Sequence, residues 1–141
     1  MNNLVLRISH GRPGALFDAD NGYYITRVSC VSATTCYASG GTKLYTITNG
    51  VPVHPQTFPD GGENSLSWRA IECTGTVCEA AGLEFPGLAW VGVLVSLSDG
   101  TAGAPTLVAA SGGFTGVATR AGVGFIAIGA GPSTGSDDTT G

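Results

Sequence analysis

The sequence predicts an all-β protein built from a repeated unit, and three observations support this prediction. A segment that ends in Ala-x-Gly occurs at residues 28–40, 71–82 and 117–129, and its closing glycines lie 42 and 47 residues apart. A period in this range is typical of repeat architectures. The 23 glycines and 7 prolines, with many Val, Thr and Ser residues, favour short strands joined by tight turns. Apolar residues alternate at period two or form short runs, and no window shows a helical stripe.

A second motif recurs in phase with the first and predicts a strand, a tight turn and another short apolar strand. Its turns are His10-Gly11, Asn49-Gly50 and Asp99-Gly100. Glycine accepts a positive φ angle, and Asn or Asp tolerates it, which suits these pairs to hairpin turns. One unit therefore comprises four short strands, with A and B around the Ala-x-Gly segment and C and D around the glycine turn.

In chain order, the prediction is an incomplete unit, two complete units and a second incomplete unit. Strands C and D are expected at about residues 3–20, complete units at about 24–60 and 66–110, and strands A and B at about 114–130. These elements form one repeat array over residues 1–130. The polar segment 131–141 is expected to be a flexible tail, because it lacks the apolar residues that would bury it.

Charge and hydropathy exclude two classes of partner. The chain has 6 basic and 10 acidic residues, and the basic ones are scattered rather than clustered on a stripe. Nucleic-acid binding needs a clustered positive face, so we do not expect it. No apolar run approaches the ~20 residues of a membrane-spanning helix. The N-terminus lacks the pattern of a signal peptide, so we expect either that a leader has been removed or that the sequence is an excerpt of a longer chain.

The four cysteines predict two disulfide bonds, Cys30 with Cys36 and Cys73 with Cys78. Each pair brackets the A–B turn at the same place in successive units, and the third copy lacks both cysteines together. Two strands that leave a tight turn bring such residues within disulfide reach, and each short loop is worth about 2 kcal/mol. The alternative is a structural zinc site drawing on both pairs, although the spacing and the separation of the units disfavour it. Disulfides imply an extracellular, secreted protein.

The cysteine-containing motif resembles the repeat of a known family. The segment 29–40, with the pattern Ser-Cys…Cys-x-Ala-x-Gly, resembles the repeat of secreted actinobacterial β-propeller proteins. The blades of those proteins are related to the bacterial-neuraminidase or Asp-box type. Residues 97–100 are similar to the Ser-x-Asp-Gly part of an Asp-box hairpin, without the tryptophan that follows it. The resemblance covers nearly all of residues 4–130 and implies β-propeller blades, each made of one four-stranded unit.

The number of blades predicts an assembly. Two complete blades and two halves make three blade equivalents, whereas propellers usually have 4–8 blades. An unclosed array would leave long unpaired edges at both ends. We therefore expect the C-terminal A–B strands of one chain to complete a blade with the N-terminal C–D strands of another. Two chains would form a six-bladed ring, a symmetric dimer, and a rotation that fails to close would give a filament. The alternative is that the missing blades lie on a longer parent chain.

The sequence contains few sets of residues that could act together in catalysis. His10 and His54 are the only histidines, and both sit at turn or loop positions. No Gly-x-Ser-x-Gly elbow occurs. A sialidase would need converging arginines, but Arg27, Arg69 and Arg120 fall out of register with one another. Asp18 and Asp20 are spaced like calcium ligands, but no calcium loop follows and a turn explains them better. We expect no enzyme activity, no cofactor and no metal.

Candidate binding residues lie in an insertion that only the second unit contains, at residues 83–90. Glu84, Phe85 and Trp90 form a candidate contact patch for a glycan or protein ligand, since aromatic rings stack on sugars. Trp68 is a further candidate, although packing between neighbouring units explains it equally well. The sequence thus predicts a non-enzymatic secreted propeller scaffold that self-assembles and displays a ligand-binding face. Alternatives are a lectin-like carbohydrate binder and a fragment of a sialidase-like or other glycoside hydrolase.

Overall fold

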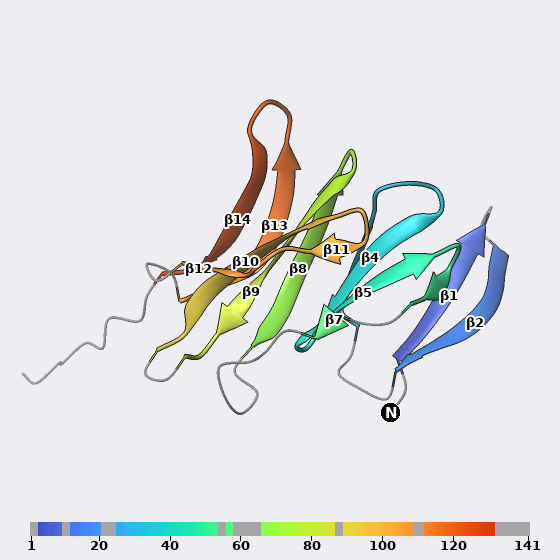
Figure 1. The fold of residues 1–141 in the computed structure, drawn as a ribbon, viewed down its shortest axis with the longest axis horizontal. Coiled ribbons are helices and arrows are strands. Elements are labelled where there is room, and N and C mark those ends of the chain that lie inside the picture. The colour runs from blue at the N-terminus through green and yellow to red at the C-terminus, as the bar shows by residue number, and fades with distance from the viewer. Residues whose placement is uncertain are drawn as a thin grey trace, which may run out of the picture.

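The prediction of an all-β chain is confirmed. The computed structural model describes residues 3–9, 12–20, 25–53, 56–57, 66–86, 89–108 and 112–131. Across these residues the chain folds into antiparallel strands, with no helix. The strands form four sheets, which we number I to IV in chain order (Figure 1). Sheets I and IV are two-stranded, and sheets II and III are five-stranded.

The sheets follow one another along the chain without exchanging strands. Sheet I consists of β1 (Asn3–Ser9) and β2 (Arg12–Asp20). Sheet II consists of β3 (Arg27–Cys30), β4 (Thr35–Gly40), β5 (Lys43–Thr48), β6 (Val51–Pro52) and β7 (Gln56–Thr57). Sheet III consists of β8 (Ser67–Thr74), β9 (Val77–Glu84), β10 (Val91–Ser98), β11 (Thr101–Ala102) and β12 (Thr106–Val108). Sheet IV consists of β13 (Gly113–Arg120) and β14 (Gly124–Ala130).

The outer strand of each complete unit differs from the expectation, because it is split into two short segments. Both β6 and β7 pair with β5, and both β11 and β12 pair with β10. In sheet III the interruption contains Pro105. A proline has no N–H to donate to the ladder and is therefore confined to strand edges and breaks.

Equivalent hairpins share one register. The Cα partners at the end of the A–B hairpin are Cys30 and Cys36, Cys73 and Cys78, and Thr119 and Phe125. Across the glycine turns they are Ser9 and Arg12, Thr48 and Val51, and Ser98 and Thr101. The turn residues Asn49 and Asp99 have φ angles of 53° and 48°, each followed by a glycine with positive φ, as the turn prediction requires. The predicted turn His10-Gly11 lies outside the described residues.

The closing position of the Ala-x-Gly motif requires glycine for a steric reason. At Gly82 a Cβ would overlap the Ser67 carbonyl oxygen, and at Gly129 it would overlap the Gly113 carbonyl oxygen. In both hairpins the register shifts nearby, which brings the first strand over the second at this point. Only glycine leaves room for that approach.

The four sheets stack face to face in chain order, I to II to III to IV (Figure 1). The main core cluster joins sheets II and III. Its members are Tyr37, Leu44, Leu66, Trp68, Ile71, Cys78, Ala80, Val93, Val95 and Leu97. A smaller cluster of Ala38, Tyr45 and Ile47 lies on the opposite face of sheet II, where Val5 of sheet I packs against it. On its other side, sheet III is covered by β13, which contacts β8 and β9.

Hydrogen bonds also connect sheets II and III. The Trp68 amide donates to the Gly41 carbonyl at 2.8 Å, and the Ala102 amide donates to Gln56 Oε1 at 2.9 Å. These bonds fix how the two complete units sit against each other, and therefore shape the surface between them.

Candidate functional site

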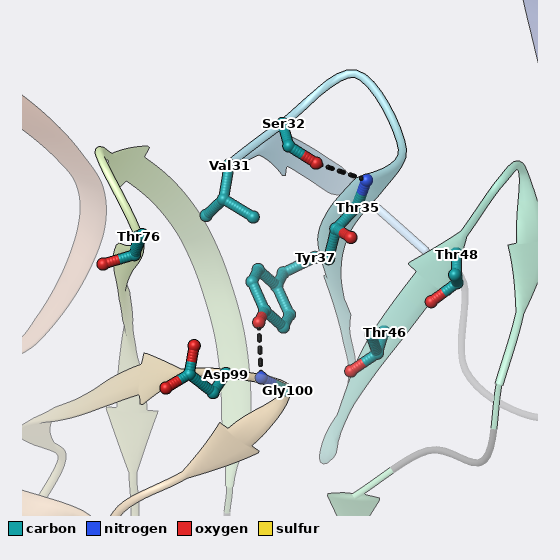
Figure 2. Close-up of a pocket in the computed structure, with 9 residues that line it drawn as sticks. All are labelled: Val31, Ser32, Thr35, Tyr37, Thr46, Thr48, Thr76, Asp99 and Gly100. Atoms are coloured by element: carbon teal, nitrogen blue, oxygen red, sulfur yellow. Dashed lines mark hydrogen bonds between the residues drawn. The ribbon is translucent and has the colours of Figure 1, made fainter.

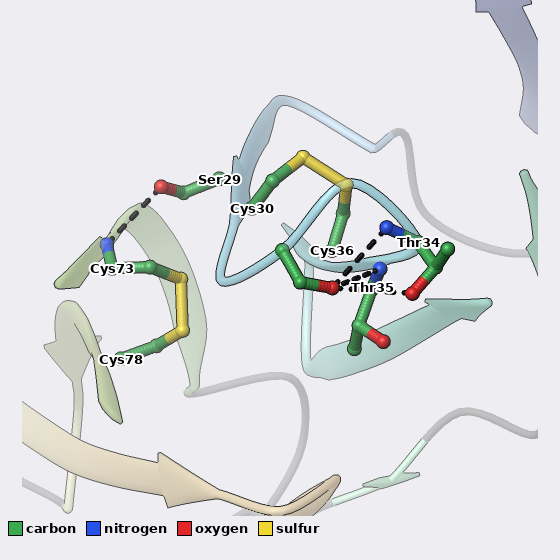
Figure 3. The surroundings of a disulfide bond; sticks show 8 residues. Ser29, Cys30, Thr34, Thr35, Cys36, Cys73 and Cys78 are labelled. Atoms are coloured by element: carbon green, nitrogen blue, oxygen red, sulfur yellow. Dashed lines mark hydrogen bonds between the residues drawn. A yellow bond between two sulfur atoms is a disulfide. The ribbon is translucent and has the colours of Figure 1, made fainter. Parts of the chain in front are cut away.

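Both predicted disulfide bonds are confirmed. Cys30 is bonded to Cys36 and Cys73 to Cys78, with Cα separations of 3.8 and 4.0 Å (Figure 3). No cysteine is free, so no thiolate is left for the alternative zinc site. Each bond closes the end of one A–B hairpin, where the strands leave a tight turn. The bonds therefore brace the loops at one end of sheets II and III.

The two disulfide loops are tied to each other. Ser29 Oγ accepts a hydrogen bond from the Cys73 amide at 3.1 Å, which links sheet II to sheet III beside the cystines (Figure 3). Within the first loop, Ser32 Oγ accepts hydrogen bonds from the Thr34 and Thr35 amides at 3.2 and 3.0 Å. Side-chain bonds of this kind replace the backbone partners that a loop lacks. The result is an ordered loop surface at this end of the molecule.

A cavity of about 460 Å³ opens beside these loops, between sheets II and III (Figure 2). Its polar lining comes from Ser32, Thr35, Thr46, Thr48, Thr76 and Asp99. The Tyr37 hydroxyl accepts a hydrogen bond of 2.6 Å from the Gly100 amide inside it. Val31 and the ring of Tyr37 also line the cavity, so hydroxyl groups and one carboxylate lie beside apolar surface. Sequence reasoning missed this cavity, since Thr46 and Thr48 meet Thr76 only when the sheets pack.

The insertion of the second unit places two of its three candidate residues in contact. The rings of Phe85 and Trp90 lie 5.1 Å apart between centroids at an interplanar angle of 51°, a tilted aromatic pair. Both side chains are exposed, and Glu84 is half-buried at the end of β9. The structure thus provides an exposed aromatic pair next to a carboxylate-bearing residue.

The fourth candidate binding residue, Trp68, lies elsewhere. Its side chain is 1% exposed and belongs to the core cluster between sheets II and III. It offers no surface to a ligand, and its burial supports the packing role that the sequence equally allowed.

Several apolar side chains at the two ends of the stack are exposed at positions where their repeat equivalents are buried. Ile128 of β14 is 63% exposed, whereas Ala81 of β9 is 0% exposed at the equivalent position. Ile126 precedes it by two residues on the same face of β14, and it is also exposed. We call Ile126 and Ile128 the C-terminal end face. Sheet IV packs on sheet III through β13, and no described residue covers this outer side.

The other end of the stack repeats this pattern. Ile8 of β1 is 68% exposed, whereas the equivalent Leu97 of β10 is 2% exposed. Val28 of β3 is 59% exposed, whereas the equivalent Ile71 of β8 is 5% exposed. Ile8 and Val28 lie on different sheets, and we call these two exposed positions together the N-terminal end face. Apolar side chains that are exposed as a group mark interaction surfaces.

Within the described part of the chain, the three arginines considered for catalysis do not come together. Arg27, Arg69 and Arg120 are exposed and belong to three different sheets. Asp18 and Asp20 lie in strand β2 rather than in the expected turn. Among the described residues, no group of three or more His, Cys, Asp or Glu side chains could hold a metal ion. His10 and His54 lie outside the described residues.

Two further findings bear on the class of protein. The part of the chain that the structure describes contains no helix able to cross a membrane. Compared with protein-family models, curated proteins and solved structures, the chain shows no match.

Proposed function

We propose that this protein is a secreted β-propeller scaffold without catalytic function, which self-assembles by sharing blades and displays a ligand-binding face. The observation that carries the proposal is the difference in burial between equivalent positions. Ile8 of sheet I, Val28 of sheet II and Ile128 of sheet IV are exposed, while the equivalent Leu97, Ile71 and Ala81 of sheet III are buried. The same repeat position is thus apolar in both settings and lacks a neighbour only at the ends.

The propeller assignment draws on the strand order and on the stacking. Sheets II and III each run in chain order from the A strand to the split outer strand, and neighbouring sheets pack face to face (Figure 1). Blades of a propeller are four-stranded antiparallel sheets arranged around an axis. The two cystines favour secretion, because disulfides persist in oxidising compartments.

The assembly proposal follows from the two incomplete sheets. Sheet IV corresponds to strands A and B, and sheet I to strands C and D, so a sheet IV from one copy and a sheet I from another supply one full set. Two copies joined in this way twice would form six blades, a number within the usual range of about 4–8. Such a dimer has closed two-fold symmetry.

The energetics favour a ring over an open pair. Burying one such side chain contributes about 1.5–3 kcal/mol. Association costs about 4–15 kcal/mol in lost translational and rotational freedom. One joint covers three exposed apolar side chains, Val28, Ile126 and Ile128, and only balances that cost. A closed dimer forms two joints for one association and is therefore the more stable form.

Size-exclusion chromatography with light scattering tests the proposal. The purified chain should elute at twice its 14.1 kDa mass, or as larger species that grow with concentration if a filament forms. Ile128→Asp should give a monomer, because it places a charge on the C-terminal end face. Leu107→Asp is the matched control, since Leu107 is exposed and apolar but lies on β12, outside both end faces. A monomer of the unaltered chain at every concentration would overturn the assembly.

A second candidate function is carbohydrate binding, which the exposed Phe85–Trp90 pair favours. Aromatic faces that stand free of the core stack on the apolar faces of sugar rings. Trp90→Ala should abolish binding on a glycan array, while Leu107→Ala should leave it unchanged. Equal loss of binding in both variants would argue against a role for the aromatic pair.

A further inference from the structure

The register of the two internal B–C pairings is the same. Ala38 of β4 lies opposite Tyr45 of β5, and Ala80 of β9 lies opposite Val95 of β10. The third copy of this alanine is Ala127 of β14. Within the described residues, β14 pairs only with β13, so the edge that carries the B–C pairing in the other units is open.

Strand β1 has the properties of the missing partner. The residues that flank its turn, Ser9 and Arg12, pair as Ser98 and Thr101 do at the end of β10. Counting back from the turn, Leu6 of β1 corresponds to Val95 of β10. Among the described strands, β1 pairs with β2 alone, so its second edge is open as well.

We propose that β14 of one copy pairs antiparallel with β1 of a second copy, with Ala127 opposite Leu6. The pairing joins sheets IV and I into one continuous sheet in the order β13-β14-β1-β2. Ile126 then lies opposite Arg7 of the second copy, and Ile128 lies opposite Val5. This inference rests on the proposed assembly and specifies its joint residue by residue.

The packing of Val5 supports this register independently. Val5 packs against the cluster that contains Ala38 on sheet II of its own chain. Residues directly opposite each other in a sheet point to the same face, so Ile128 would face that same sheet II of the second copy. A slip of one residue would turn Ile126 and Ile128 to the other face. In this register the C-terminal end face therefore lies against the side of sheet II that Val5 already contacts.

Val28 lies on this surface of sheet II and is the residue that Ile126 of the other copy would contact. It lies opposite Ala38, on the face of sheet II that receives Val5, and it is exposed in the single chain. Between sheets II and III, the equivalent residues Tyr37 and Ile71 share the core cluster. Ile126 and Val28 hold those two positions across the joint. One contact therefore accounts for Ile126, Ile128 and Val28, whereas Ile8 lies on the opposite face of β1 from Val5.

A cysteine cross-link measures the register. The pair Arg7→Cys with Ile126→Cys places thiols at positions equivalent to Ser96 and Glu79, whose side chains meet in a hydrogen bond of 2.7 Å. Under mild oxidation, most of the chain should shift from 14.1 kDa to twice that mass on non-reducing gels, and mass spectrometry should identify the joined peptides. A ladder of higher multiples would show the same joint in a filament.

The control is Leu6→Cys with Ile126→Cys, in which the two thiols point to opposite faces and should not cross-link. An assembled chain that cross-links through the control pair, or through neither pair, would overturn the register and leave the assembly standing. A monomer by light scattering would overturn both. Hydrogen exchange of the unaltered protein provides a measurement without cysteines: β1 and β14 amides should exchange as slowly as those of β9 and β10, and fast exchange in the assembled chain would contradict the joint.

Discussion

The hairpins β8–β9 and β13–β14 carry the same motif in different surroundings. The first lies between sheets II and IV, holds a disulfide bond and buries Trp68, Ala80 and Ala81. The second has the same register and no cystine, and among the described residues it has a neighbour on one side only, so that its Ile128 is exposed. The difference teaches that the motif determines the hairpin, while burial depends on what packs against it.

The largest expected loss of stability comes from truncating the residue opposite the closing glycine, and this loss should differ between the two hairpins. Trp68 and Phe114 lie opposite the closing glycines of β8–β9 and β13–β14, but Trp68 is buried and Phe114 is half-buried. Trp68→Ala should lower the free energy of unfolding by about 3–5 kcal/mol, because it leaves a cavity in a packed core. Phe114→Ala should lower it by less. Urea denaturation of both variants measures the difference, and equal losses would mean that sheet IV is packed as tightly as sheet III.

Removal of the two cystines should also cost different amounts of stability, with the larger loss in sheet III. Replacing Cys73 and Cys78 by alanine removes a loop constraint of about 2 kcal/mol. It also removes packing, because Cys78 is a buried member of the main core cluster. Replacing Cys30 and Cys36 removes the constraint but less packing, since Cys30 is exposed. Thermal unfolding should therefore show a larger drop in Tm for the sheet III pair, and the reverse order would contradict the packing argument.

The smallest effect concerns the contact between the two complete units. Tyr37→Phe removes the acceptor of the Gly100 amide and should cost about 0.5–1.5 kcal/mol. The Gly100 amide should exchange with solvent faster in this variant, as measured by NMR, while the amides of β9 keep their protection. Unchanged exchange at Gly100 would show that another acceptor serves this amide.

Much of the local structure could be predicted from particular residues. The alternation of apolar residues and the Asn-Gly and Asp-Gly turns predict hairpins, because two-residue turns set the register of the strands they join. The cysteine pairs predict disulfides, because the two cysteines of each pair flank a tight turn and therefore face each other across the hairpin. The split of the outer strand was not predicted, although Pro105 provides a signal for it.

The candidate site was harder to predict. Phe85 and Trp90 could be chosen because they stand in an unrepeated insertion, but their contact across the intervening residues could not. Trp68 looked equally suited to binding and to packing, and its burial depends on residues from sheet II. The cavity between sheets II and III was missed, because Thr46 and Thr76 are 30 residues apart and meet only across two sheets.

By itself the sequence determined the class of fold, the hairpins and the cystines, because these depend on neighbouring residues, alternation and turn chemistry. Only the tertiary structure decided which apolar positions are covered. Ile71 and Val28 occupy the same place in the repeat, and one is buried while the other is exposed. Burial is a property of two surfaces that meet, and the second surface is supplied by another part of the fold.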